Sequence, residues 1–181
     1  MTQETASPSA RRTELLEAAY RYVLDHGLAD LSLRPLAAAI GSSPRVLLFL
    51  FGSKDGLIRE LLARARADEL AFLGRLDGHI GLATAAERLW EWIAAPERRP
   101  LVRLWIEAYG RSLVEPDGAW AGFAKATVDD WLAMLTECEP GADPARRTLV
   151  LAVLRGAFLD LIATGDADRT GAAVRLHLDL L

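Results

Sequence analysis

Residues 32–57 read SLRPLAAAIGSSPRVLLFLFGSKDGL, and the order of helix-starting and helix-ending residues in this stretch decides the fold. Serine is favoured immediately before a helix, and Pro44 directly after a serine is typical of a first helical turn. Gly41 interrupts the apolar spacing between the two starts. We therefore expect two short helices, at about 32–40 and 43–51, joined by the tight turn of a helix-turn-helix unit.

The helical spacing of apolar residues continues on both sides of this unit. No segment alternates apolar and polar residues between hairpin turns, so we expect an all-α fold. Thr84 and Glu87 form a capping-box pattern that predicts a helix start at Thr84. The further helices are expected at about 9–26, 53–73, 84–93, 101–113, 120–138, 143–164 and 168–181.

Three parts follow from these elements: a head of three helices, a helical-bundle body and a short N-terminal lead-in. We expect a disordered lead-in over 1–8, the helix-turn-helix head over 9–56 and the body over 57–181, with the long helix 53–73 as the link. The first 66 residues carry a net charge of +2 and the remainder −6, and all five Trp lie in the body. This split indicates a slightly basic head and an acidic, aromatic-rich body with different roles.

Composition excludes several classes of protein. The 181 residues are 51% hydrophobic and 25% charged with a net charge of −4, which is ordinary for a globular chain and gives no whole-chain sign of nucleic-acid binding. The single cysteine, Cys138, excludes an internal disulfide and a cysteine-based zinc site and fits a reducing cytosol. No apolar run approaches the roughly 18 residues of a membrane span, and the N-terminus lacks a secretory pattern. We expect a cytoplasmic protein that does not contact a membrane.

Enzyme signatures are missing from the sequence. It holds no glycine-rich phosphate loop, no His-Glu-x-x-His and no Gly-x-Ser-x-Gly, and its histidines, His26, His79 and His177, are too far apart to suggest a ligand cluster. We therefore expect no catalytic residues, no metal and no cofactor. A helical enzyme without a cofactor is left as a remote alternative.

The segment from Arg12 to Leu57 resembles the tetracycline-repressor (TetR) family of bacterial transcriptional regulators. The resemblance rests on the spacing of many positions together, whereas the body is similar only in character. The matching residues are Arg12, Leu16, Ala18, Ala19, Gly27, Ala37, Gly41, Ser43, Leu47, Phe51, Ser53, Lys54, Asp55 and Leu57.

This resemblance implies which side chains would meet double-stranded DNA. Lys54 would contact a phosphate at the N-terminus of the helix 53–73, aided by free backbone N–H groups. Ser32 and Arg34 would lie beside the DNA backbone or a groove edge. The positions that enter the major groove in the family are occupied here by Ser42, Ser43, Pro44, Arg45, Val46, Leu48, Phe49 and Leu50.

These residues depart from the family pattern. Leu48 or Phe49 and Leu50 replace the Tyr and His that the family usually places near the end of the helix, and only Arg45 can bond guanine through two hydrogen bonds, worth about 1–3 kcal/mol of discrimination. Val46 and Phe49 could meet thymine methyl groups. Base reading is expected to be poor in hydrogen bonds. A head with weakened DNA binding, a patch that contacts protein and plain core packing are open alternatives.

The body is rich in rings, and the family resemblance implies an effector cavity among its middle helices. Rings with few polar groups are typical of pockets for apolar ligands. Plain core packing is the alternative for the rings, and a ladder of charges along one helix, from Arg103, is the alternative for the anchors. We expect the lining to be Trp105, Tyr109, Phe123, Trp131 and Phe158, with Glu107, Arg111 or Arg155 as the polar anchor.

The last two helices have broad apolar arcs and small residues. In the family such a pair forms a four-helix interface around a twofold axis; an intrachain core is the alternative. The interface residues expected here are Leu149, Val153, Ala157, Leu161, Val174 and Leu178. The resemblance thus implies a homodimeric repressor that binds a palindromic operator and is released by a small, largely apolar effector. The alternative is a helical ligand-binding or protein-interaction module whose head no longer binds DNA specifically.

Overall fold

The computed structural model describes residues 8–28, 30–76 and 78–180, and within these ranges every regular element is helical, as predicted. No single helix in the described ranges is long and apolar enough to cross a membrane. The bent pair Leu33–Ala39 and Pro44–Phe51 reaches the necessary length and apolar composition only when the two helices are taken together. The expected lead-in lies outside the described residues except for Pro8, which already belongs to the first helix. The elements are α1 (Pro8–His26), α2 (Leu33–Ala39), α3 (Pro44–Phe51), α4 (Lys54–Leu73), α5 (Leu82–Ala94), the short 3-10 helix η1 (Pro96–Arg98), α6 (Arg99–Val114), α7 (Phe123–Cys138), α8 (Pro144–Thr164) and α9 (Ala167–Leu178).

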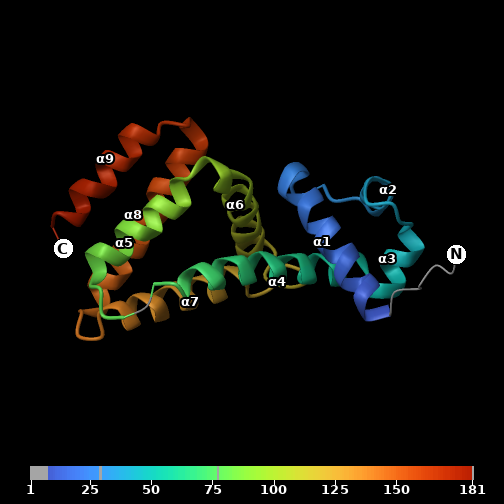
Figure 1. Ribbon diagram of the computed structural model, residues 1–181, viewed down its shortest axis with the longest axis horizontal. Coiled ribbons are helices and arrows are strands. Elements are labelled where there is room, and N and C mark those ends of the chain that lie inside the picture. Colours follow the sequence, from blue (N-terminus) through green and yellow to red (C-terminus); the bar gives the residue numbers. More distant parts are fainter. Residues whose placement is uncertain (1–7, 29, 77, 181) are drawn as a thin grey trace, which may run out of the picture.

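The helices α1, α2 and α3 form the head at one end of the molecule (Figure 1). The Ser43 hydroxyl accepts a hydrogen bond from the Val46 backbone N–H at 3.3 Å, which caps α3. Ser32 precedes α2, but its side chain makes no capping hydrogen bond, so α2 begins without the cap that its sequence indicates. The axes of α2 and α3 are bent by 102° relative to each other, as in a helix-turn-helix unit.

The long helix α4 leads from the head into the body (Figure 1). Its N-terminus is capped by Ser53, whose hydroxyl accepts from the Gly56 N–H at 2.9 Å. Near the head, Arg64 pairs with Glu17 of α1 at 2.5 Å. Farther along, Arg66 forms two hydrogen bonds with Asp130 of α7, at 2.6 and 2.8 Å. The helix is therefore tied to both parts by charged pairs.

Three predicted helix starts in the body are wrong. The helix α6 begins at Arg99, directly after η1 and two residues before the expected start. A glycine decides the other two starts. The helix α5 begins at Leu82, two residues before the expected capping box, because Gly81 adopts a left-handed φ of 80° and the Glu139 carboxylate accepts the Leu82 N–H at 2.8 Å. The helix α7 begins at Phe123, after a left-handed Gly122, and leaves Trp120 in the preceding turn. In both cases a glycine at positive φ sets the boundary.

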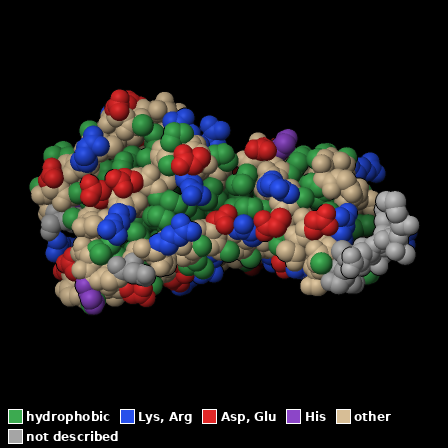
Figure 2. Space-filling view, in the orientation of Figure 1, with side chains coloured by type: hydrophobic (Ala, Val, Ile, Leu, Met, Phe, Trp, Pro, Cys, Tyr) green, Lys and Arg blue, Asp and Glu red, His purple; other side chains and the backbone are tan. Residues whose placement is uncertain are grey.

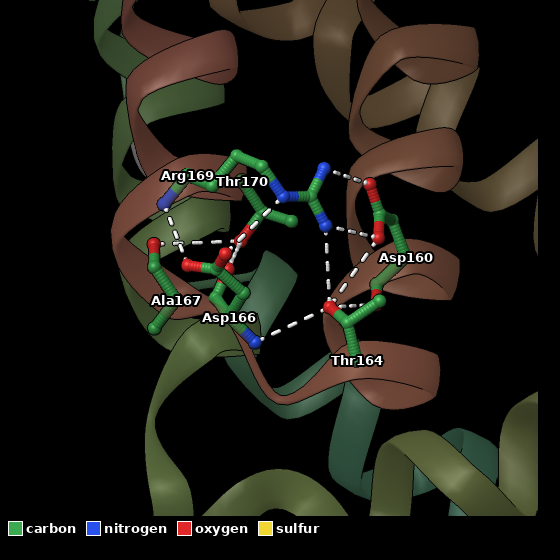
Figure 3. A network of polar contacts seen from close by, with 6 residues as sticks. All are labelled: Asp160, Thr164, Asp166, Ala167, Arg169 and Thr170. Atoms are coloured by element: carbon green, nitrogen blue, oxygen red, sulfur yellow. Dashed lines mark hydrogen bonds and ion pairs between the residues drawn. The ribbon is translucent and has the colours of Figure 1, made fainter.

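A network of polar contacts fixes the corner between α8 and α9 (Figure 3). Arg169 reaches back from α9 to Asp160 of α8 with two hydrogen bonds, at 2.6 and 2.7 Å, and also bonds Asp166. The Arg169 guanidinium lowers the pKa of the Asp160 carboxyl below its ordinary value by hydrogen bonding. The side chain of Asp166 in turn accepts the Arg169 N–H and caps α9. The corner thereby holds the last two helices against each other.

Candidate DNA-binding surface and ligand cavity

The helix α3 divides its apolar residues between the core and the surface. Leu47 and Phe51 are buried, whereas Val46 is 39% exposed and Phe49 is 83% exposed. Leu48 is exposed as well. The core-packing alternative therefore does not hold for Phe49. A large ring left this open on a short helix indicates a surface that meets another molecule.

Three cations of the head were predicted to contact DNA. Arg34, Arg45 and Lys54 are exposed, and none of them forms an ion pair with any residue in the described ranges. Arg12 differs, because it pairs with Glu60 at 2.8 Å and covers the ring of Phe51. These three cations therefore have no ion-pair partner in the part of the chain that the structure describes, whereas Arg12 has a structural role.

The predicted serines differ in what their hydroxyls can do. Ser32 and Ser43 are exposed, and the Ser43 hydroxyl still has its hydrogen to donate while it caps α3. The Ser42 hydroxyl is buried without a hydrogen-bond partner. Pro44 is half-buried in the first turn of α3. Ser43 is therefore the better placed of the two adjacent serines for a phosphate contact.

On the face that Figure 2 shows, charged side chains are mixed rather than gathered by sign. Figure 2 shows Lys and Arg side chains interspersed with Asp and Glu along both the head and the body on the face in view. On this face there is no broad basic field of the kind that draws nucleic acid from a distance. Any DNA binding by this head would depend on the few free cations around α3.

A cavity of about 290 Å³ lies between α6, α7 and α8. All five aromatic residues expected to line a pocket do line it, together with the expected anchor Arg155. Sequence reasoning missed the smaller lining residues, because nothing in an apolar stripe distinguishes a cavity wall from a packed core. The missed residues are Ile106, Gly110, Leu113, Thr127, Leu151 and Leu159.

The side-chain polar groups of this cavity belong to Trp105, Tyr109, Thr127 and Arg155; two of them can only donate hydrogen bonds, and the two hydroxyls can donate or accept. The Trp105 Nε1–H and the Thr127 hydroxyl are buried without a hydrogen-bond partner. The Arg155 guanidinium lies over the Tyr109 ring, 5.0 Å from its centre. Trp131 donates its own Nε1–H to Glu69 and so has none to offer a ligand.

The other two expected anchors have different roles. Glu107 does not line the cavity; its two carboxylate oxygens accept the backbone N–H of Leu28, at 3.1 and 3.0 Å, just beyond the end of α1. Arg111 pairs with Glu115 at 2.5 Å. The alternative of a charge ladder from Arg103 through Glu107 therefore does not hold either, because Glu107 joins the body to the head. This bond fixes the position of α6 relative to α1.

Sequence reasoning also missed Glu69, a fully buried carboxylate on α4. One of its oxygens accepts the Trp131 Nε1–H, and the other has no partner. Burial raises the pKa of Glu69 to about 7, a shift that the hydrogen bond from Trp131 and the nearby Arg66 oppose and Asp130 increases. Its position in line with the buried Ala65 and Leu73 of α4 was a usable signal, since a carboxylate on an apolar stripe needs an explanation.

Aromatic rings connect the cavity to α4 from a second side. Trp131 meets Trp105 edge to face, with 6.2 Å between the ring centres, and the ring centres of Trp105 and Trp92 are 5.7 Å apart. Trp92 stacks on Phe72 of α4 at 4.4 Å. Two routes of direct contact, one through Glu69 and one through these rings, therefore join the cavity wall to the helix that carries the head.

The expected interface residues do not all lie on a surface. Leu161 and Val174 are buried in the chain's own core at 1% exposure, so they are unsuited to contact a partner chain. Val153, Ala157 and Leu178 are half-buried, and Leu149 is 52% exposed. Leu176, which belongs to the apolar arc of the last helix but not to the expected interface set, is more exposed still. An exposed apolar face of α8 and α9 is available, but it is not the full predicted set.

Comparison with known proteins places the chain among regulators. Residues 15–61 match the family described as bacterial regulatory proteins, tetR family. The HTH-type transcriptional regulator BetI of Rhizobium meliloti (strain 1021) is 30% identical over 145 residues, which cover 78% of this chain and 58% of that protein. The chain thus spans less than two thirds of the length of this relative.

Solved structures share the fold over nearly the whole chain. The multidrug binding protein EbrR in complex with proflavin is 25% identical with a TM-score of 0.70, and the match covers 94% of this chain and 99% of that one. A TetR transcription regulator from Haloarcula marismortui ATCC 43049 has a TM-score of 0.73 at 18% identity, over 96% and 98% of the two chains. At that identity the second likeness concerns the fold alone.

Proposed function

Because this chain belongs to the TetR family of bacterial regulatory proteins, we propose that it is a homodimeric transcriptional repressor that binds a palindromic DNA operator in the cytoplasm and is released by a small, largely apolar effector. The observation that carries the proposal is the surface of α3, where Arg45 and Phe49 are exposed and free of intrachain partners at the end of the head. Such a helix fits a major groove about 12 Å wide.

The head supplies two kinds of DNA contact in this proposal. Lys54, Arg34 and Ser43 bind phosphates and set the register, because contacts to phosphate position a protein without reading sequence. Arg45 reads guanine, and Val46 and Phe49 pack on thymine methyl groups. Specificity would therefore depend on one arginine and on apolar fit.

Release would follow from the contacts between the cavity and the head. EbrR binds proflavin, and a cavity lies between the middle helices of this chain. A ligand that moves Trp131 would act on α4 through Glu69, and one that moves α6 would act on Leu28 through Glu107. Coupling of this kind typically changes affinity by about 1–3 kcal/mol.

Dimerisation through α8 and α9 is supported by their exposed leucines, and two half-sites need two heads. Light scattering coupled to size-exclusion chromatography should give the wild-type protein twice the 19.7 kDa mass of one chain. Joint replacement of Leu149→Asp and Leu176→Asp should yield the single-chain mass, because a carboxylate in an apolar interface loses its hydration. The exposed Leu70→Asp on α4 is the matched control and should leave the dimer intact. An unchanged mass for the double variant would place the interface elsewhere.

The function is tested by fluorescence anisotropy with duplexes that tile the intergenic DNA beside the protein's own gene. One duplex should bind saturably, and its log K should fall against log salt with a slope near −5 if about six phosphates are contacted. Lys54→Ala should weaken binding to all duplexes and make this slope shallower by about 1 per head. Arg103→Ala, an exposed arginine on the body, is the control and should change neither quantity.

A second candidate function is favoured by the same exposed residues. Val46, Leu48 and Phe49 form an apolar patch that also fits a protein partner. Under this candidate the head binds no duplex preferentially, and Phe49→Ser leaves the weak binding to DNA unchanged. A single preferred duplex whose affinity falls in Phe49→Ser favours the repressor.

A further inference from the structure

The cavity between α6, α7 and α8 carries an excess of hydrogen-bond donors. Trp105 offers an N–H and cannot accept a hydrogen bond, and Arg155 offers only donors. The hydroxyls of Thr127 and Tyr109 can donate or accept, and that of Thr127 has no partner among the described residues. No acidic side chain is among the described residues that line the cavity.

The donors of Trp105 and Arg155 have no acceptor within the described residues, and a ligand could supply one. Trp105 is 5% exposed, and its buried Nε1–H has no hydrogen-bond partner among the described residues. An unpaired buried donor is unfavourable until an acceptor arrives. Arg155 is half-buried and forms no ion pair with any residue that the structure describes. Its guanidinium face is used on Tyr109, which leaves the edge with its N–H groups for an anion.

The walls restrict the shape of the ligand. Five rings surround the cavity, and Trp105 and Trp131 already meet edge to face at 6.2 Å. Flat rings fit such walls by stacking or by edge contact. At about 290 Å³ the cavity lies at the lower end of the range for small-molecule sites, so it suits one or two fused rings rather than a large ring system.

The carboxylate nearest to the rings does not change this electrostatic balance. Glu69 lies behind Trp131, which donates a hydrogen bond to it, and is not among the lining residues. A cation in the cavity would therefore meet Arg155 directly and reach Glu69 only after Trp131 had moved.

We propose that this cavity selects a small planar aromatic carboxylate, held by Arg155 at the carboxylate and by Trp105 through its free N–H. The inference rests on the proposed function, in which the same cavity is the effector site. It deepens that function by giving the effector a charge. Cationic ligands of the same size are excluded by the unpaired guanidinium.

The test is calorimetric titration of the purified protein, without DNA, with four probes on one naphthalene frame. The probes are 2-naphthoate, 2-naphthamide, 2-methylnaphthalene and 2-naphthylmethylammonium. Naphthoate should bind at least about tenfold tighter than the ammonium compound, since a hydrogen bond to a charged group is worth about 1.5–3 kcal/mol. The affinity of the amide, which keeps a hydrogen-bond acceptor without the charge, should lie between those of naphthoate and the ammonium compound.

Variants assign the preference to its residues. Arg155→Met should remove the preference for naphthoate, and Arg155→Lys should keep part of it because the charge remains. Trp105→Phe removes the N–H together with part of the ring system, so it should weaken the binding of naphthoate and naphthamide at least about threefold more than the binding of 2-methylnaphthalene, which senses only the lost ring area. Arg103→Met is the control and should behave as wild type. Circular dichroism confirms that each variant is folded.

Three results would overturn the inference. These are equal or tighter binding of the ammonium probe, a naphthoate preference that persists in both Arg155 variants, and no binding by any of the four probes. Because no DNA is present, these results bear on the ligand class alone. Failure of the proposed function would appear separately, as naphthoate binding with no effect on any DNA complex.

Discussion

Arg45→Ala is expected to weaken binding of the preferred duplex by at least about 30-fold. Each bidentate contact to guanine is worth about 1–3 kcal/mol, and a dimer places two copies of Arg45 on its operator. The exposed position of Arg45 on α3, without an intrachain ion pair, means that its removal should not destabilise the fold. The measurement is anisotropy on the preferred duplex and on an unrelated one.

The pattern of loss separates base reading from simple charge. Arg45→Lys keeps the charge without the fork of the guanidinium, so it should retain most of the binding to the unrelated duplex but lose much of the preference. Arg103→Ala controls for the loss of an exposed arginine. If Arg45→Ala weakens both duplexes equally and leaves their affinity ratio unchanged, Arg45 contacts phosphate and the apolar residues must read the operator.

Glu69 should give the protein a stability that falls as pH rises from about 4.5 to about 7. Its pKa is 4.5 in a model peptide and about 7 in the folded protein, where burial disfavours the charged form. The folded state therefore holds its proton more tightly than the unfolded state. The contribution of Glu69 to the free energy of unfolding is fully present below pH 4.5 and is lost as pH rises through 7. A difference of this size corresponds to about 3 kcal/mol of free energy of unfolding.

Urea unfolding of wild type and Glu69→Gln at several pH values from 4.5 to 8.5 measures this effect as a difference. As pH rises, the free energy of unfolding of wild type should fall relative to that of Glu69→Gln, and the difference between the two should become constant above pH 8. Glu91→Gln replaces an exposed glutamate of α5, and its free energy of unfolding should depend on pH in the same way as that of wild type. If Glu69→Gln also runs parallel, the carboxylate gains solvent or a partner in solution and is not a buried group.

The head could be predicted in detail because its signals are local. Ser43, Pro44 and Gly41 fix the turn and the start of α3 by their own backbone preferences, and the structure places them as expected. One failure in the body occurred where a distant residue decides a local feature. The start of α5 depends on Glu139, which is 57 residues away, and no local pattern contains that contact.

The cavity could be predicted only in part for the same reason. Large rings on the middle helices indicated the walls of the cavity, but the role of Glu107 is to accept the N–H of Leu28 in the head, a contact that no local pattern contains. Likewise Leu161 and Val174 belong to apolar arcs that look alike in sequence on both faces, and only packing shows which face is buried. Periodicity identifies a broad apolar surface without saying which part the chain covers itself.

The most direct test of the central claim is hydroxyl-radical footprinting of the duplex that the wild-type protein prefers. A dimer that places two α3 helices in successive major grooves should protect two patches on each strand, centred about 34–36 Å or one helical turn apart, with twofold symmetry. Protection should weaken at both patches together in Arg45→Ala. A single patch, or uniform protection without a boundary, would contradict a symmetric two-headed regulator and favour the exposed apolar face of α3 as a site for protein.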